Sequence, residues 1–133
     1  MSKENLNISK IETYLNSIVD GVVSNNTYFT TLPDKSVIDS SDWSDIVLID
    51  FPMGIKDFDA YGRGEVDIVL YARPFGSGKK NVPKMAELEE KLNEAISNAP
   101  ITNYALRRDD VHSAYDTDIK WHCNVYTYII QVI

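Results

Sequence analysis

Two stretches of this chain repeat their apolar residues at helical spacing, and the segments between and after them are patterned as strands. The first stretch has polar residues on its opposite face and predicts an amphipathic helix of about four turns. Asn7 is placed to cap the start of this helix, and Gly21 is placed to end it or to weaken its last turn. The apolar face consists of Ile8, Ile11, Leu15, Ile18 and Val22.

The second helical stretch is expected to start near Val82 and Pro83, because proline is tolerated in the first turn, and to stop at Pro100. On its polar side, Glu87 and Lys91 have the spacing of a favourable ion pair within a helix. Its apolar stripe is formed by Met85, Leu88, Leu92, Ala95, Ile96 and Ala99.

Strand patterns occupy most of the remaining chain, whereas residues 36–44 are polar and turn-like. A turn around Asp116 and Thr117 separates the last two strand segments, which therefore predict a closing hairpin. The predicted strands are residues 27–32, 46–51, 65–71, 103–112 and 118–132.

The order of elements, helix, strand, strand, strand, helix, strand, strand, predicts the α+β class. Short connections favour antiparallel pairing, so we expect a mostly antiparallel sheet of about five strands with the two amphipathic helices packed on one face. The 133 residues are close to the usual size of one domain, and no repeat or linker divides them. Residues 1–133 are expected to form a single domain.

Acidic residues outnumber basic ones, with 20 Asp and Glu against 13 Lys and Arg, for a net charge of −7. This is the wrong sign for a protein that neutralises phosphates, so nucleic acid is not an expected partner. Residues 34–67 carry most of the imbalance, with nine acidic and three basic side chains. No apolar run approaches the roughly 20 residues of a membrane span, and the polar first residues lack the apolar centre of a signal peptide. The expected location is the cytoplasm, without membrane contact.

The run Gly76-Ser77-Gly78-Lys79-Lys80 lies between a predicted strand and a predicted helix, where a phosphate-binding loop would be found. The P-loop pattern requires glycine at position 73 and serine or threonine at position 80. Arg73 and Lys80 occupy these positions, so an ordinary β-to-α connection is expected.

Histidine, cysteine and aspartate do not form a complete metal or nucleophile pattern. His122 and Cys123 are neighbours in a strand and point to opposite faces, so we expect Cys123 in the core. As the single cysteine, it cannot form an internal disulfide, which fits a reducing compartment. His112 and His122 could face each other across the hairpin, but two histidines alone make a poor zinc site. Five aspartates could gather around a calcium ion, but they lack the spacing of an EF-hand, so no metal or cofactor is predicted. They are Asp39, Asp42, Asp45, Asp57 and Asp59.

One alternative involves catalysis. Asp110, followed by Asp118 and Lys120, is similar to the carboxylate and lysine arrangement of metal-dependent nucleases. In that arrangement the carboxylates hold the metal and the lysine steadies the attacking water. The acidic net charge disfavours DNA binding, so a small nuclease is the second hypothesis.

The element order and several local stretches resemble the tail terminator and tail completion proteins of long-tailed phages. The stretches are the first helix, Val47-Leu48-Ile49-Asp50-Phe51, Gly64-Glu-Val-Asp-Ile-Val-Leu-Tyr-Ala-Arg73 with the helix of Met85 to Ala99, and Asp116-Thr-Asp-Ile-Lys-Trp-His-Cys-Asn-Val-Tyr-Thr-Tyr128. The likeness spans most of the chain and lies in hydrophobic pattern, because the family has no diagnostic motif.

This resemblance implies a non-enzymatic structural protein of a phage or prophage tail. Such proteins form a ring, commonly a hexamer, that caps the tail tube and offers a joint to the head. The implied partners are copies of the chain, the tail tube and head-connector proteins. The implied locations are the host cytoplasm during assembly and then the virion tail. Another head-tail connector component or mobile-element adaptor is a further alternative.

A loop at residues 53–64 mixes glycines with aromatic side chains, which are costly to leave exposed. We expect this loop and its flank to pack on a neighbouring subunit. The candidate interface residues are Phe51, Met53, Phe58 and Tyr61.

Overall fold

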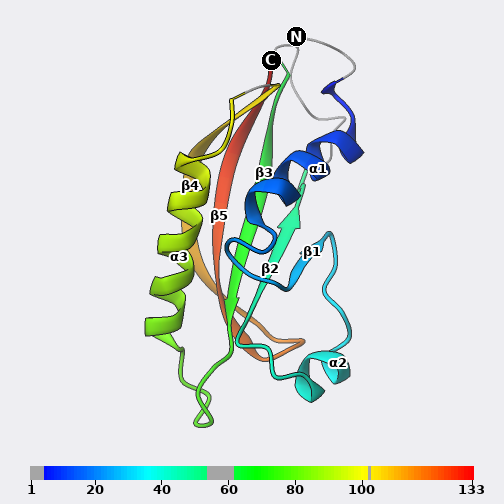
Figure 1. Cartoon of the computed structure of the whole chain (residues 1–133). Helices are drawn as coiled ribbons and strands as arrows, with labels where there is room; N and C mark the ends of the chain where they lie inside the picture. Colours follow the sequence, from blue (N-terminus) through cyan, green and yellow to red (C-terminus); the bar gives the residue numbers. More distant parts are fainter. Residues whose placement is uncertain (1–4, 54–61, 102) are drawn as a thin grey trace.

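The computed structural model describes residues 5–53, 62–101 and 103–133 and contains three helices and five strands in that part of the chain. The elements are α1 (Ile8–Val19), β1 (Thr27–Phe29), α2 (Lys35–Ser40), β2 (Asp45–Asp50), β3 (Arg63–Ala72), α3 (Val82–Ser97), β4 (Tyr104–Asp116) and β5 (Trp121–Val132). The strands form one sheet in the order β1-β2-β3-β5-β4, and Figure 1 shows α1 and α3 in front of it.

The α+β class is confirmed, but the sheet is mixed rather than mostly antiparallel. β1 pairs with β2 in parallel, while β2 with β3, β3 with β5, and β4 with β5 are antiparallel. Parallel neighbours require a crossover, and the connection that contains α2 provides it. β1 is also shorter than expected, because Thr30 has a φ of 69° and turns the chain out of the sheet.

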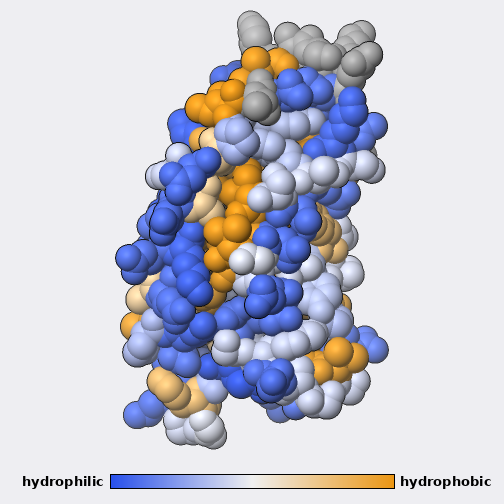
Figure 2. Space-filling view, in the orientation of Figure 1, coloured by the Kyte–Doolittle hydropathy of each residue, from blue (hydrophilic) through white to orange (hydrophobic). Residues whose placement is uncertain are grey.

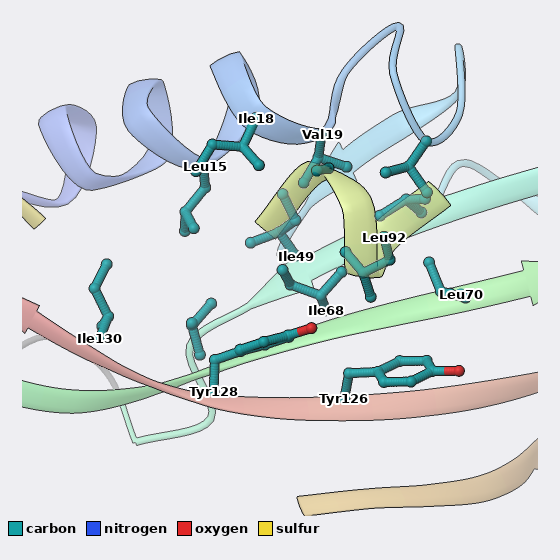
Figure 3. Packing of buried hydrophobic residues seen from close by; sticks show 14 of the residues in the cluster. Leu15, Ile18, Val19, Ile49, Ile68, Leu70, Leu92, Tyr126, Tyr128 and Ile130 are labelled. Carbon is teal, nitrogen blue, oxygen red and sulfur yellow. The ribbon is translucent and has the colours of Figure 1, made fainter. Parts of the chain in front are cut away.

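The main core lies between the sheet and the two predicted helices. Leu15 of α1 and Leu92 of α3 meet Ile49, Ile68 and Tyr128 of the sheet in one buried cluster (Figure 3). The packing of both amphipathic helices on the same core is therefore confirmed. Among the described residues, every buried side-chain nitrogen or oxygen atom has a hydrogen-bond partner, and this includes the hydroxyl of Tyr128.

Both helix starts follow the sequence prediction. Asn7 Oδ1 accepts hydrogen bonds from the backbone nitrogens of Ser9 and Lys10 at 3.0 and 3.2 Å. Gly21 adopts a φ of 74° just after α1, as expected of a residue that ends the helix, but the helix stops before Val22, which was expected on its apolar face. Val22 is consequently 53% exposed instead of lying on the apolar stripe, and Val23 takes the buried position.

A second, smaller core lies on the opposite face of the sheet, beneath a helix that the sequence did not predict. Five of the six residues of α2 lie within residues 36–44, for which a polar turn is expected, and Ile38 is its one buried side chain. One apolar residue shows no periodicity, which explains the missed helix. The cluster comprises Ile38, Ile46, Val69, Tyr71, Ile119, Trp121 and Cys123.

An ion pair joins the start of α3 to the start of β2. Lys84 Nζ lies 3.2 Å from Asp45 Oδ2, and both side chains are largely buried. Ser24 and Ser44 donate hydrogen bonds to the same carboxylate at 2.5 and 2.8 Å. Burial by itself would raise the pKa of Asp45, but these donors together with Lys84 hold its pKa below the ordinary value.

Replacing Asp45 with asparagine should flatten the acid side of the stability profile. Because the pKa of Asp45 is lower in the folded chain, its contribution to stability is present above the unfolded-state pKa of about 3.9 and is lost as pH falls through the folded-state value. Asp45→Asn should cost about 2 kcal/mol of unfolding free energy at neutral pH, and this difference should shrink on acidification. Urea titrations across this pH range measure this difference.

Asp39→Asn, which removes an exposed pair with Lys35, is the matched control and should cost well under about 1 kcal/mol. Equal pH dependence in Asp45→Asn and wild type would contradict the assignment.

Candidate interaction surface

β4 forms one edge of the sheet and is exposed over most of its length. It is the last strand in the sheet order, with β5 as its single described neighbour. From Arg107 to Tyr115 every residue is exposed. The outer side of an edge strand presents unpaired backbone N–H and C=O groups that can pair with another chain. This strand is therefore the longest open hydrogen-bonding surface among the described strands.

A β-bulge interrupts the ladder in the middle of β4. Arg107 pairs with Ile129 and Arg108 with Tyr128, but the next ladder position on β5, Thr127, is taken by Asp110. Asp109 is the additional residue of the bulge. Ile129 and Thr127 are two positions apart on β5 and share a face of the sheet. The bulge therefore places Arg107 and Asp110 on that same face although they are three residues apart.

The guanidinium of Arg108 is held against the helix-covered face of the sheet. It lies 5.0 Å from the ring centroid of Tyr126 and 5.6 Å from that of Tyr128, distances typical of cation–π contacts. It also donates to the Tyr128 hydroxyl at 3.1 Å and to Asn93 of α3. Arg108 thus points inward across β5 rather than outward from the edge.

Figure 2 shows the helix-covered side of the molecule, with hydrophilic surface on α3 and apolar surface between the two long helices. A groove of about 320 Å³ lies there, and Val22 and Ala99 belong to its lining. Ile18 and Ala95, which also line it, are buried members of the main core. The groove is thus a shallow opening over the core.

The predicted interface residues are only partly within the described chain. Phe51 follows β2, is half-buried, and packs against the main core of its own subunit. Met53 is 57% exposed, as an intersubunit contact requires. Phe58 and Tyr61 lie outside the described residues. The intersubunit role of these four residues remains a prediction.

The acidic residues of the 34–67 stretch that the structure describes do not form one surface. Asp45 lies beneath the surface in its pair with Lys84, whereas Asp39 pairs with Lys35 on α2. Asp50 and Asp67 are register partners on the face opposite α1 and α3, where Asp67 Oδ1 accepts a 2.6 Å hydrogen bond from Thr127. The charges are thus distributed among separate environments.

The Gly76–Lys80 segment is an ordered β-to-α connection. Its turn is closed by hydrogen bonds from Gly78 N to Phe75 O at 2.7 Å and from Phe75 N to Lys79 O at 3.1 Å. Lys80 Nζ donates to Asn124 Oδ1 at 3.0 Å, which ties the connection to β5. These backbone and side-chain donors are engaged within the chain, consistent with the expected connection.

The structure does not bring the nuclease candidates together. Asp110 pairs with Thr127 in mid-strand, while Asp118 and Lys120 lie in the turn beyond Asp116. The separation along the strand is on the order of 20 Å, from a rise of about 3.3 Å per residue. Asp118 instead lines a hollow of about 390 Å³ next to Tyr71. Among the described residues, no group of three or more His, Cys, Asp and Glu is arranged to hold a metal ion.

Cys123 is buried, as predicted, and burial raises the pKa of its thiol to about 11. The suggested cross-strand pairing of the histidines is wrong. His112 lies opposite Val125 and His122 opposite Tyr115, because the turn spans residues 117–120 and pairs Asp116 with Trp121. The rings of His122 and Tyr115 pack in a T-shaped arrangement with a centroid distance of 4.9 Å.

Arg73 is a structural residue that the sequence reasoning missed. Its guanidinium donates to the backbone oxygens of Trp43, Ile38 and Ser41 at 2.6, 3.1 and 3.3 Å, and it stacks 4.8 Å from the Trp121 ring centroid. The sequence signal for the edge, two arginines followed by two aspartates at positions 107–110, was also missed. This signal can be interpreted only with the bulge, which places Arg107 and Asp110 on the same face of the sheet.

No protein-family model matches this chain, and a search of curated proteins finds no match either. No helix in the described part of the chain has the length and apolar character needed to cross a bilayer.

Proposed function

We propose that this chain is a non-enzymatic structural protein of a phage or prophage tail. In this role it forms a ring of identical subunits that caps the tail tube and joins it to the head. Assembly through protein contacts is the whole activity, and no step of bond chemistry is required. The protein is made in the host cytoplasm and ends in the virion tail.

The observation that supports an assembly role is the combination of an open sheet edge with an exposed apolar residue at a loop. β4 is exposed over most of its length, and Met53 stands 57% exposed at the end of the described chain after β2. Open strand edges are features that proteins cover in an assembly, and Met53 is one of several exposed apolar side chains on the described surface. The resemblance in element order to tail terminator proteins is the reason for proposing a ring on a tail tube.

Electron microscopy of the purified protein, alone and mixed with tail tubes assembled from the tube protein of the same genome, tests the proposal. Rings on the grid, or added density at one end of the tubes, are the expected results. Binding to a head-connector complex instead of the tube would favour the connector alternative. Absence of rings and of binding to either assembly would overturn the proposal.

A pair of matched variants tests the loop as the ring contact. Met53→Glu should abolish ring formation, because a charge would be buried between subunits. Val82→Glu, at a 59% exposed position on α3, should leave rings intact. Rings that form equally well in both variants would remove Met53 from the interface.

A further inference from the structure

The charge order along the exposed edge of β4 is self-complementary. The bulge and the inward-pointing Arg108 are features that protect edge strands against pairing, but β4 contains none of the lysines that most commonly do so. Instead, Arg107 and Arg108 precede Asp109 and Asp110. Two such strands running in opposite directions can therefore oppose an arginine of one copy to an aspartate of the other.

We propose that a second copy of this chain binds the outer edge of β4 through the same strand, antiparallel and around a two-fold axis at Arg108. A two-fold axis perpendicular to a sheet pairs only residues that lie on the same face. Arg107 and Asp110 meet this condition because of the bulge; in a regular strand, residues three apart would point to opposite faces. Because of the bulge, an antiparallel pairing of two copies can place Arg107 of one copy opposite Asp110 of the other.

This register can be read outward from Arg108. Arg107 faces Asp110 of the second copy, and the symmetry repeats this pair. One step further, Leu106 faces Val111 of the second copy on the helix-covered face, since their β5 partners Ile130 and Tyr126 share that face. Val111 is 42% exposed in the single chain, so pairing gives it an apolar neighbour.

The two Arg108 guanidinium groups would not face each other across the axis. Each Arg108 guanidinium is folded back over Tyr126 and Tyr128 of its own chain, away from the edge. Arg107, in contrast, has no ion pair among the described residues. Asp110 has a 3.6 Å contact with His112 Nδ1 on the exposed strand surface. In the proposed dimer, Asp110 of the second copy becomes the ion-pair partner of Arg107.

This contact shares the β4 edge with the observation that supports an assembly role, but it does not require the loop that follows β2, to which the ring contact is assigned. It forms a closed pair of subunits and joins two five-stranded sheets along one edge. The chain could pair in this way whether or not it caps a tail tube.

Sedimentation velocity of the full chain, over a concentration series from ~1 µM to ~1 mM, tests the proposal. Wild type should show a monomer–dimer equilibrium. Arg107→Asp and Asp110→Arg should each raise the dimer dissociation constant about tenfold, because like charges then face each other twice. The double variant restores opposite charges and should return the constant to within about threefold of wild type.

The two single variants also separate specific pairing from general repulsion. They change the net charge of −7 in opposite directions, so a general charge effect would weaken one dimer and tighten the other. Asp118→Arg, which makes the same charge change in the turn beyond the paired segment, should leave the constant unchanged. Circular dichroism checks that each variant is folded. A wild type that stays monomeric, single variants that dimerise normally, or a double variant without rescue would each overturn the proposal.

Discussion

Replacing Leu92 with alanine should lower the free energy of unfolding by about 3 kcal/mol. Leu92 is fully buried on α3 and lies among Val19, Ile49 and Ile68 in the layer that joins both long helices to the sheet (Figure 3). Truncation removes three carbon atoms from this contact and leaves a cavity that rigid strands cannot collapse to fill. The loss is a large share of the total stability of a domain, which is on the order of 10 kcal/mol.

Urea unfolding followed by circular dichroism measures this change. Val82→Ala is the matched control, because Val82 lies in the first turn of the same helix and is 59% exposed. Its cost should stay below about 0.5 kcal/mol. A loss at Leu92 no larger than the loss at Val82 would show that α3 is not held by this core.

Replacing Arg73 with methionine should cost about 3 kcal/mol and loosen α2 from the sheet. Methionine keeps much of the side-chain volume but removes every donor, so the backbone oxygens of Ile38, Ser41 and Trp43 lose their common partner. Those oxygens close the end of α2 and the segment that leads into β2. The ring of Trp121 also loses the cation stacked on it.

Intrinsic fluorescence gives a direct readout of this loosening. The chain has two tryptophans, and both belong to the α2 face of the sheet, Trp121 in the buried cluster and Trp43 packed against it. Arg73→Met should therefore shift the native emission to longer wavelength, as water reaches these rings. Leu92→Ala should leave the native emission unchanged, because its cavity lies on the other face.

Arg73→Lys separates the charge from the geometry. Lysine retains the cation but cannot reproduce the planar fork that reaches three carbonyls at once, so its loss should be intermediate. A lysine variant as stable as wild type would mean that charge alone holds α2. An unshifted emission in Arg73→Met would mean that α2 is held by Ile38 and not by the arginine.

Local pattern determined the largest elements of this protein. The apolar stripes of α1 and α3, the cap at Asn7 and the alternation of β5 are each set by residues within one or two turns or along one strand. Such patterns can be read because burial of one face selects the same residues at every repeat. The α+β class and the shared core of the two helices followed from them.

The candidate surface could be predicted only in part. Aromatic and apolar residues around Met53 predict a contact loop; Met53 is exposed, and its role in an interface stays a prediction. The edge at Arg107 and Asp110 was read as part of an ordinary strand with one aspartate available for catalysis. The proposed pairing depends on the bulge, which is a feature of how β4 pairs with β5.

By itself, then, the sequence determined where helices and strands form and which of their faces are apolar, since these depend on neighbouring residues. Only the tertiary structure decided that β1 runs parallel to β2, that α2 covers the far face, and that Arg73 holds it there. It also decided that Arg107 and Asp110 share a face. Each of these depends on hydrogen bonds and packing between residues far apart in the chain, whose register no local periodicity encodes.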